Sequence, residues 1–242
     1  MCYNSLLYAC FSDHYNLSKE KMPRRSQIAL VTGAVKGFGY HIGKELIRRV
    51  PSTVTYMSSR GDTGGMEAIL GMELGGAARQ RGKFITMDVT DPMSIARHRD
   101  AIVKRYGGLD ILVNNAAIYE KPDVANLENF KAQTKRILAT NYWGTKNVYS
   151  AFYSDIKTNA RIVNITSNLA HVKENNTTEV EELKRKTRDR FNAVNSLFEL
   201  DGMVLKFQFD VDTGSCKEEG WPECAYSVSK MAINTFTRFD FP

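Results

Sequence analysis

The sequence predicts an α/β protein with a doubly wound parallel sheet in a single domain. Three observations support this fold class. From Ile28 onward, short β-rich runs alternate with longer amphipathic segments, and the first and last of these runs are almost entirely apolar. Such strands are typical of a parallel sheet with helices on both faces. The 242 residues are enough for one sizeable core.

Five strands are predicted, with helices between them. The strands read IALVT (28–32), TVTYMSS (53–59), KFITMDV (83–89), LDILVNNA (109–116) and RIVNITS (161–167). In the segment YHIGKELIRRV, the residues Ile42, Leu46, Ile47 and Val50 fall on one stripe of a helix, and SIARHRDAIVKRY (94–106) repeats the pattern. Right-handed crossovers between parallel strands then follow.

The predicted domain covers residues 26–242. Residues 1–25 show no periodicity, so we predict a flexible N-terminal extension there. Residues 171–220 interrupt the alternation of strands and helices and are predicted to be an insertion. Within it, EVEELKRKTRDR mixes both charges at helical spacing, for example Glu182 with Lys186, which predicts a solvated helix face.

Composition excludes several classes of function. The net charge of +6 comes from segments of mixed sign, which argues against a nucleic-acid partner. The apolar runs are far shorter than the ~20 residues of a membrane span. The four cysteines show neither C-x-x-C nor zinc-site spacing, so no metal site is predicted. Free thiols fit a reducing compartment, and we predict a cytoplasmic protein.

A glycine-rich loop follows the first predicted strand and opens the first helix. It reads VTGAVKGFGYHIG, with Gly33, Gly37 and Gly39 at the turn. In this context such glycines allow a tight turn and close approach of a pyrophosphate, whose charge faces the N–H groups at the helix start. The loop therefore predicts a Rossmann-like dinucleotide site.

The end of the second predicted strand indicates which dinucleotide binds. A carboxylate there would hydrogen-bond the ribose hydroxyl of NAD, but this strand ends in MSSR. Arg60 stands near the expected acid, and Lys36 in the loop adds a second cation. Both are good phosphate partners, so NADPH is the predicted cofactor, although Asp62 also lies close by.

The spacing Tyr226-x-x-x-Lys230 predicts proton-transfer chemistry. Residues four apart share one face of a helix, so the lysine cation can favour the ionised form of the phenol. Reduction of a carbonyl leaves an alkoxide that needs a proton donor of this kind. As an isolated pattern the spacing is common in helices.

Five ordered motifs together resemble the short-chain dehydrogenases/reductases. They are Thr32-Gly33-x-x-x-Gly37-x-Gly39, Asn114-Asn115-Ala116, Asn141 in NYWG, Ser167 at the end of VNITS, and Tyr226-x-x-x-Lys230. The resemblance implies that Tyr226 is the acid/base, that Ser167 bonds the substrate oxygen, and that Lys230 holds the cofactor ribose. It also implies that Asn141 supports a proton-relay water.

The resemblance also implies a set of cofactor-binding residues. They are Gly33, Lys36, Gly37, Phe38, Gly39, Arg60, Asp88, Val89, Asn115, Ala116, Tyr226 and Lys230. One departure from the family pattern is Ala117, where glycine is usual. Alanine has a Cβ that glycine lacks, so this difference affects how closely the backbone at position 117 can approach the cofactor.

The long segment between Ser167 and Tyr226, closed by EGWP, is similar to that of the NADPH-dependent carbonyl reductases. The likeness implies reduction of aldehydes, ketones and quinones. It also implies a monomer, because the insertion covers a surface used for tetramers elsewhere in the family. Trp221 is expected either near the pocket mouth or in packing.

The sequence also leads us to expect that the C-terminal strands of the family are lacking. Few residues follow Lys230 before Pro242. Two functions therefore remain open: a carbonyl reductase, or a catalytically weak or inactive reductase that binds cofactor or protein partners.

Overall fold

The structure is a computed structural model of two compact units. It describes residues 26–61, 64–173 and 177–239. We call residues 26–116 and 144–165 the sheet unit, and residues 117–143 and 166–239 the helical unit. The predicted N-terminal extension at 1–25 lies outside the described residues, and the prediction of one domain over 26–242 stays a prediction.

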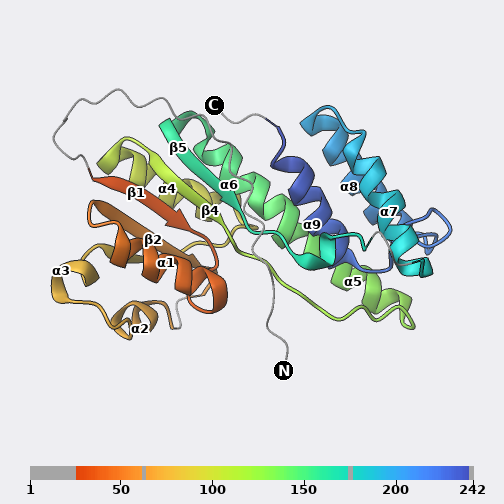
Figure 1. The fold of residues 1–242 in the computed structure, drawn as a ribbon, viewed down its shortest axis with the longest axis horizontal. Helices are drawn as coiled ribbons and strands as arrows, with labels where there is room; N and C mark the ends of the chain where they lie inside the picture. The colour runs from red at the N-terminus through yellow and green to blue at the C-terminus, as the bar shows by residue number, and fades with distance from the viewer. Residues whose placement is uncertain (1–25, 62–63, 174–176, 240–242) are drawn as a thin grey trace. The chain divides into compact units, whose positions relative to one another are not determined.

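The sheet unit is built on five parallel strands in the order β3-β2-β1-β4-β5 (Figure 1). The strands are β1 (Gln27–Val31), β2 (Thr53–Ser59), β3 (Gly82–Thr86), β4 (Leu109–Asn114) and β5 (Ile156–Asn164). The most apolar strand, β1, lies at the centre with a neighbour on each side. This sheet confirms the predicted fold class.

Two strands differ from their predicted bounds by three residues or more at one end or both. Strand β3 ends at Thr86, because the chain then turns: the Asp91 N–H donates to the Asp88 carbonyl at 3.1 Å. Strand β5 begins earlier than predicted and ends at Asn164. Ser167 therefore lies outside the strand, on the segment that follows it.

Helices cover both faces of the sheet. They are α1 (Gly37–Arg49), α2 (Gly65–Leu70), α3 (Gly76–Arg79), α4 (Pro92–Tyr106) and α6 (Gly144–Phe152), followed by the short 3-10 helix η2 (Tyr153–Asp155). One core contains Ile95 of α4 and Val148 of α6, and the other contains Ile47 of α1. Leu30 belongs to the first core and Val31 to the second, as the alternation of side chains along a strand requires.

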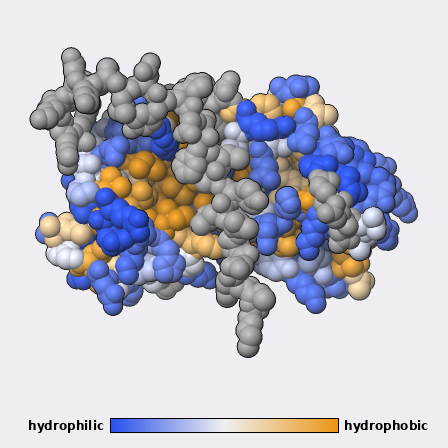
Figure 2. Space-filling view, viewed as in Figure 1, coloured by the Kyte–Doolittle hydropathy of each residue, from blue (hydrophilic) through white to orange (hydrophobic). Residues whose placement is uncertain are grey.

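The second core is bordered by apolar residues that are only partly buried. Ile111, Val163 and Ile165 pack against it from β4 and from the end of β5. Figure 2 shows a hydrophobic area over the strands of this unit. The same alternation that builds the core therefore also leaves apolar surface on one face of the sheet.

The helical unit consists of helices around α9. They are α5 (Leu127–Leu138), the π-helix η1 (Ala139–Trp143), the 3-10 helix η3 (Asn168–Ala170), α7 (Glu179–Asn192), α8 (Leu197–Asp212) and α9 (Ala225–Phe236). Helix α9 packs against α5, α7 and α8 (Figure 1). Its buried face holds Val228 and Phe236, neither of which is exposed to solvent.

Helix α7 is only partly the solvated helix that its charges predict. Lys186 and Glu182 form the expected exposed ion pair, at 3.0 Å. Glu181 and Lys184 are instead buried, and they pair with each other at 3.0 Å. The Lys184 ammonium also donates to the His171 carbonyl at 2.6 Å, so the buried charges are compensated by hydrogen bonds.

Trp221 packs in the interior of the helical unit and does not lie at the mouth of a pocket. Its side chain is fully buried, and its ring lies 5.4 Å from that of Phe207 and 6.3 Å from that of Phe191. The indole N–H donates to Asp210 Oδ2 at 2.7 Å. A buried aromatic ring with a satisfied polar end fixes the segment that leads into α9.

Some kinds of site are not found in the part of the chain that the structure describes. None of its helices is long and apolar enough to cross a membrane. No group of three or more His, Cys, Asp and Glu side chains there could hold a metal ion. Cys216 and Cys224 are free thiols, whereas Cys2 and Cys10 fall outside the described residues.

Candidate active site

The glycine-rich loop of the sheet unit has the backbone geometry of a phosphate cradle. Gly33 and Gly37 adopt φ of 63° and 59°, in the left-handed region that favours glycine. A Cβ at Gly33 would come within 2.8 Å of the Ala116 Cα, and one at Gly39 within 2.4 Å of the Asn115 Nδ2. At Gly37 a Cβ would meet no described atom within 4 Å, so the loop is open there. These features fit a bound dinucleotide.

Helix α1 begins directly at this loop. Its first turn, all of it described, contains no acidic residue, and Lys36 immediately precedes it. The first N–H groups of a helix have no partner within the helix and carry partial positive charge. The start of α1 can therefore accept a pyrophosphate.

Thr32 ties the loop to the segment after β4. Its Oγ1 accepts the N–H groups of Asn115 and Ala116, each at 3.0 Å. The Asn115 side-chain amide donates in turn to the carbonyls of Thr32 and Gly33, each at 2.9 Å. Thr32 was part of the sequence motif, but this positioning role was not predicted because it joins residues more than eighty positions apart.

Replacing Gly39 by alanine is expected to destabilise the protein and weaken dinucleotide binding. The new Cβ would lie 2.4 Å from the Asn115 Nδ2 and 2.6 Å from the Gly33 carbonyl oxygen, so the loop must shift. We expect a loss of about 1–3 kcal/mol in the free energy of unfolding, measured by chemical denaturation. Gly76→Ala is the control, because the Cβ there meets no described atom within 4 Å; equal stability of the two variants would contradict the prediction.

The other predicted cofactor residues of the sheet unit differ in their surroundings. Arg60 is exposed directly after β2, and Phe38 is 48% exposed at the start of α1. Asp88 Oδ1 accepts both the N–H and the hydroxyl of Thr90, each at 2.8 Å, which holds the carboxylate in place. Val89 is buried in the core and packs there. Asp62, the nearby acid, lies outside the described residues.

The four predicted catalytic residues all lie in the helical unit. Tyr226 and Lys230 share one face of α9, with the Lys230 ammonium 5.8 Å from the centre of the Tyr226 ring. Lys230 is 3% exposed, and burial lowers the pKa of its ammonium to about 8. A cation next to a phenol stabilises the phenolate, which is the chemistry expected from the spacing.

The Ser167 hydroxyl lies near the phenol of Tyr226. Burial raises the pKa of Tyr226, whereas the neighbouring Ser167 hydroxyl lowers it. Ser167 caps the short helix η3, where its Oγ accepts the Leu169 N–H at 3.2 Å. The cap fixes the hydroxyl next to the phenol. The ring of Tyr119 packs edge-on against that of Tyr226, with centroids 5.1 Å apart.

Asn141 lies in η1, a π-helical turn of the kind often found at functional sites. Its amide group donates to the Ile118 carbonyl at 3.0 Å and to the Ser229 Oγ at 3.1 Å, and its Oδ1 accepts the Ile118 N–H at 2.8 Å. Ser229 itself donates to the Tyr226 carbonyl at 2.8 Å. Asn141 is therefore linked through Ser229 to the backbone of the helix that carries Tyr226.

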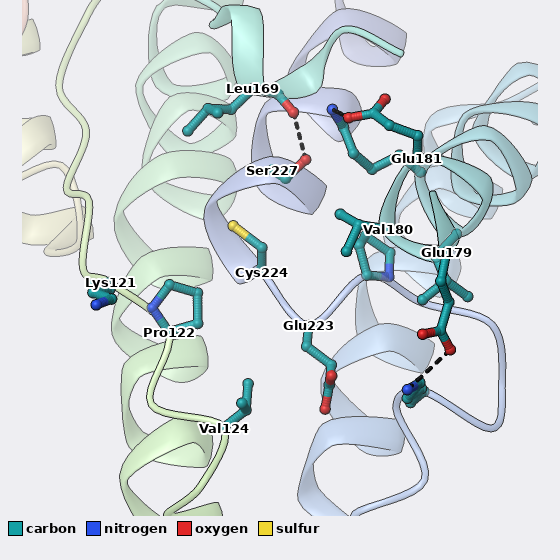
Figure 3. A pocket seen from close by; sticks show the side chains of 14 residues that line it. Lys121, Pro122, Val124, Leu169, Glu179, Val180, Glu181, Glu223, Cys224 and Ser227 are labelled. Atoms are coloured by element: carbon teal, nitrogen blue, oxygen red, sulfur yellow. Dashed lines mark hydrogen bonds and ion pairs between the residues drawn. The ribbon is translucent and has the colours of Figure 1, made fainter. Parts of the chain in front are cut away.

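A pocket of about 450 Å³ opens at the start of α9. Figure 3 shows Ser227 on α9 and Cys224 directly before it, with Pro122 and Val124 to one side and Val180 to the other. The apolar lining also includes Leu169, Leu183 and Pro222. Cys224 and Ser227 are the near neighbours of Tyr226 at the start of this helix. Burial raises the pKa of the Cys224 thiol, which leaves it in its neutral form.

Comparison with known proteins identifies the family. The sequence model of the short chain dehydrogenase family matches residues 27–180. Carbonyl reductase (NADPH) 3 of Mus musculus is 34% identical over 215 residues, which cover 88% of this chain and 73% of the relative. The chain belongs to the short-chain dehydrogenase family. It is therefore an oxidoreductase.

Two further similar proteins agree with this assignment. Carbonyl reductase (NADPH) 1 of Homo sapiens is 35% identical over 211 residues, 87% of this chain and 72% of the relative. The solved structure of menthone neomenthol reductase from Mentha piperita matches with a TM-score of 0.74 and 28% identity, covering 88% of this chain and 84% of that chain. The predicted resemblance is thereby confirmed.

The departure at Ala117 causes no backbone strain. Among the described residues, Asn159 is the one non-glycine residue with a positive φ, so Ala117 is outside the left-handed region. The positioning residues that sequence reasoning missed are Thr32, Tyr119 and Ser229. Two of them carried a signal in the sequence: Thr32 begins the glycine motif, and Tyr119 is an aromatic residue shortly after the Asn-Asn-Ala motif.

Proposed function

We propose that this short-chain dehydrogenase reduces aldehydes, ketones and quinones to alcohols with NADPH, and that Tyr226 is the proton donor. The observation that carries the proposal is the arrangement around α9, where the half-buried phenol of Tyr226 lies near the Ser167 hydroxyl and next to the Lys230 ammonium. NADPH, when bound, supplies the hydride.

Ser167, Tyr226 and Lys230 each have a separate role in reducing the carbonyl group. The Ser167 hydroxyl donates a hydrogen bond to that oxygen and holds it near the phenol. The Tyr226 O–H transfers its proton to the oxygen as negative charge develops there. Lys230 stabilises the resulting phenolate, and Asn141 holds α9 in place through Ser229.

The pocket at the start of α9, which Cys224 and Ser227 line, supports an apolar substrate. Proline, valine and leucine side chains form much of its lining. Four of the six charged residues that line it form ion pairs, Glu179 with Lys217 at 2.9 Å and Glu181 with Lys184 at 3.0 Å. Such a pocket favours a hydrophobic carbonyl compound over a strongly charged one.

Two observations support NADPH as the cofactor: the cofactor named for the relatives, and the positive charges near the glycine-rich loop. The relatives named above are carbonyl reductases that use NADPH, and Arg60 with Lys36 supplies two exposed cations at the end of β2 and the start of α1. We also propose a cytosolic enzyme, because the cysteine spacing suits free thiols.

Charge reversal at Arg60 tests the cofactor assignment. Arg60→Asp is expected to lower the preference for NADPH over NADH by about 10- to 100-fold, the range of one charge-assisted contact. The measurement is the ratio of the two dissociation constants, from quenching of protein fluorescence. Arg97→Asp, an equal charge change at another exposed position, serves as the control. A ratio that is the same in both variants would remove Arg60 from the site.

The direct test of the function is titration with NADPH followed by addition of a quinone or an apolar aldehyde. We expect binding, and then oxidation of NADPH when the carbonyl compound is added. Binding without oxidation would favour the alternative of a non-catalytic, cofactor-binding protein. Absence of binding would refute the proposal as a whole.

A further inference from the structure

Helix α8 carries a stripe of exposed apolar side chains. Phe198 is 86% exposed, Leu205 53% and Phe209 65%. Together with the exposed Gly202 they follow the spacing of four, three and four residues that places side chains on one face of a helix. The opposite face of α8, with Leu200, Val204, Phe207 and Val211, is fully buried. Helix α8 is therefore apolar on two sides, and among the described residues only one of these sides is buried.

Large contiguous apolar surfaces on soluble proteins usually mark interaction sites. The spacing of residues in this stripe indicates that its partner is a second copy of the same chain. Read along the helix it is Phe-x-x-x-Gly-x-x-Leu-x-x-x-Phe, which has the same spacing in both directions. If two copies of α8 pair antiparallel about the middle of this pattern, Phe198 of one meets Phe209 of the other, and Leu205 of each meets Gly202 of the other.

The surface at Gly202 has room for such a leucine. A Cβ at Gly202 would meet no described atom within 4 Å, and a hollow of about 350 Å³ opens there, floored in part by Val194 and Met203. Glycine in the middle of a helix costs about 1 kcal/mol relative to alanine. A side chain of a partner that enters the hollow would explain why glycine, rather than alanine, stands at position 202.

Charges beside the stripe also suit a second copy. Glu199 and Lys206 are seven residues apart, so they lie on the same flank of the stripe, and both line the hollow. In an antiparallel pair related by a two-fold axis, equal flanks face each other. Measured along the helix axis, Glu199 of each copy is then offset from Lys206 of the other copy by about two residues, or roughly 3 Å. Opposite charges therefore lie near each other on both sides of the axis, where Lys206 also pairs with Asp210 and Glu219 of its own chain.

We propose that the protein forms a symmetric homodimer through this stripe, with the two α8 helices antiparallel. This replaces the sequence-based expectation of a monomer, which considered only what the insertion covers and not its own outer face. A contact made mainly by one pair of helices is at the small end of specific interfaces, so we expect a dissociation constant in the micromolar range, about 1–100 µM.

The first test is the mass of the full chain by sedimentation equilibrium over a range of concentrations. We expect a shift from the 27.3 kDa monomer to twice that mass as concentration rises. Leu205→Glu should place a charge in the centre of the contact and weaken dimerisation at least 10-fold. Met93→Glu is the matched control, since Met93 is 72% exposed on α4 and outside the stripe. Circular dichroism verifies that both variants fold.

The second test concerns the antiparallel register. When Phe198→Cys and Phe209→Cys variants are mixed and oxidised, the proposed pairing joins residue 198 of one chain to residue 209 of the other, identified by peptide mass spectrometry. A monomeric mass at all concentrations up to about 100 µM overturns the proposal. So does a dimer that Leu205→Glu leaves intact, or cross-linking of 198 to 198 in its place.

Discussion

Replacing Tyr226 by phenylalanine is expected to lower kcat for carbonyl reduction by about 10²- to 10⁴-fold. The substitution removes only the hydroxyl, so it removes the proposed proton donor near Ser167. The ring contact with Tyr119, at 5.1 Å, is kept. Because the phosphate loop is unchanged, NADPH should bind with nearly the same affinity. Steady-state kinetics together with a fluorescence titration measure the two effects separately.

The matched control for this prediction is Tyr119→Phe. It removes a phenol hydroxyl from the ring that packs against Tyr226 and leaves the Tyr226 hydroxyl in place. We expect a change in kcat of less than about 10-fold, because Tyr119 is not assigned a proton-transfer role. If Tyr119→Phe lost activity and Tyr226→Phe kept it, the proton donor would be Tyr119, and the proposed assignment to Tyr226 would be wrong.

The parts of the fold that depend on local periodicity could be predicted from the sequence. The apolar run of β1 and the stripe formed by Ile42, Leu46 and Ile47 each determine one element, and the structure contains both. Strand ends were less accurate. Strand β3 stops at Thr86 because the Asp88 turn follows, and a turn of this kind is not visible in the hydrophobic pattern.

The parts of the site that depend on contacts distant in sequence could not be predicted in this way. Tyr226 and Lys230 are four residues apart on one helix, so their spacing alone indicated their contact. The contact between Asn141 and Ser229 joins residues 88 positions apart, and no local pattern reveals it. The outer stripe of α8 was missed for another reason: a helix that is apolar on two sides shows no clear amphipathic period.

Replacing Lys230 by methionine is expected to separate activity from stability. Burial lowers the pKa of Lys230 to about 8 from 10.5, so the charged lysine is costly to bury. Below about pH 8 this cost amounts to about 3 kcal/mol in the free energy of unfolding. Methionine fills a similar volume without charge. The variant should still fold at pH 7 and yet lose kcat by about 10²-fold or more, because the phenolate of Tyr226 loses its cation.

The same shift predicts the pH dependence. Between about pH 8 and 10.5 the unfolded chain binds the lysine proton and the folded chain does not, so the free energy of unfolding should rise with pH through this window. The activity should move the opposite way: kcat/KM falls above about pH 8, as Lys230 loses its charge in the free enzyme. Denaturation curves and rate profiles over this range measure both. In Lys230→Met the rise in stability should be absent.

Lys184→Met is the control for burial of a lysine as such. Lys184 is 8% exposed, but it is paired with the buried Glu181 at 3.0 Å, so its removal leaves a carboxylate without its cation. We expect that variant to be destabilised by about 3 kcal/mol or more. If Lys230→Met is destabilised to the same extent, Lys230 is held by compensating interactions as Lys184 is, and its loss of activity would have a structural cause. A stable, inactive Lys230→Met supports the electrostatic role, because methionine then removes the charge without disturbing the helix that holds Tyr226.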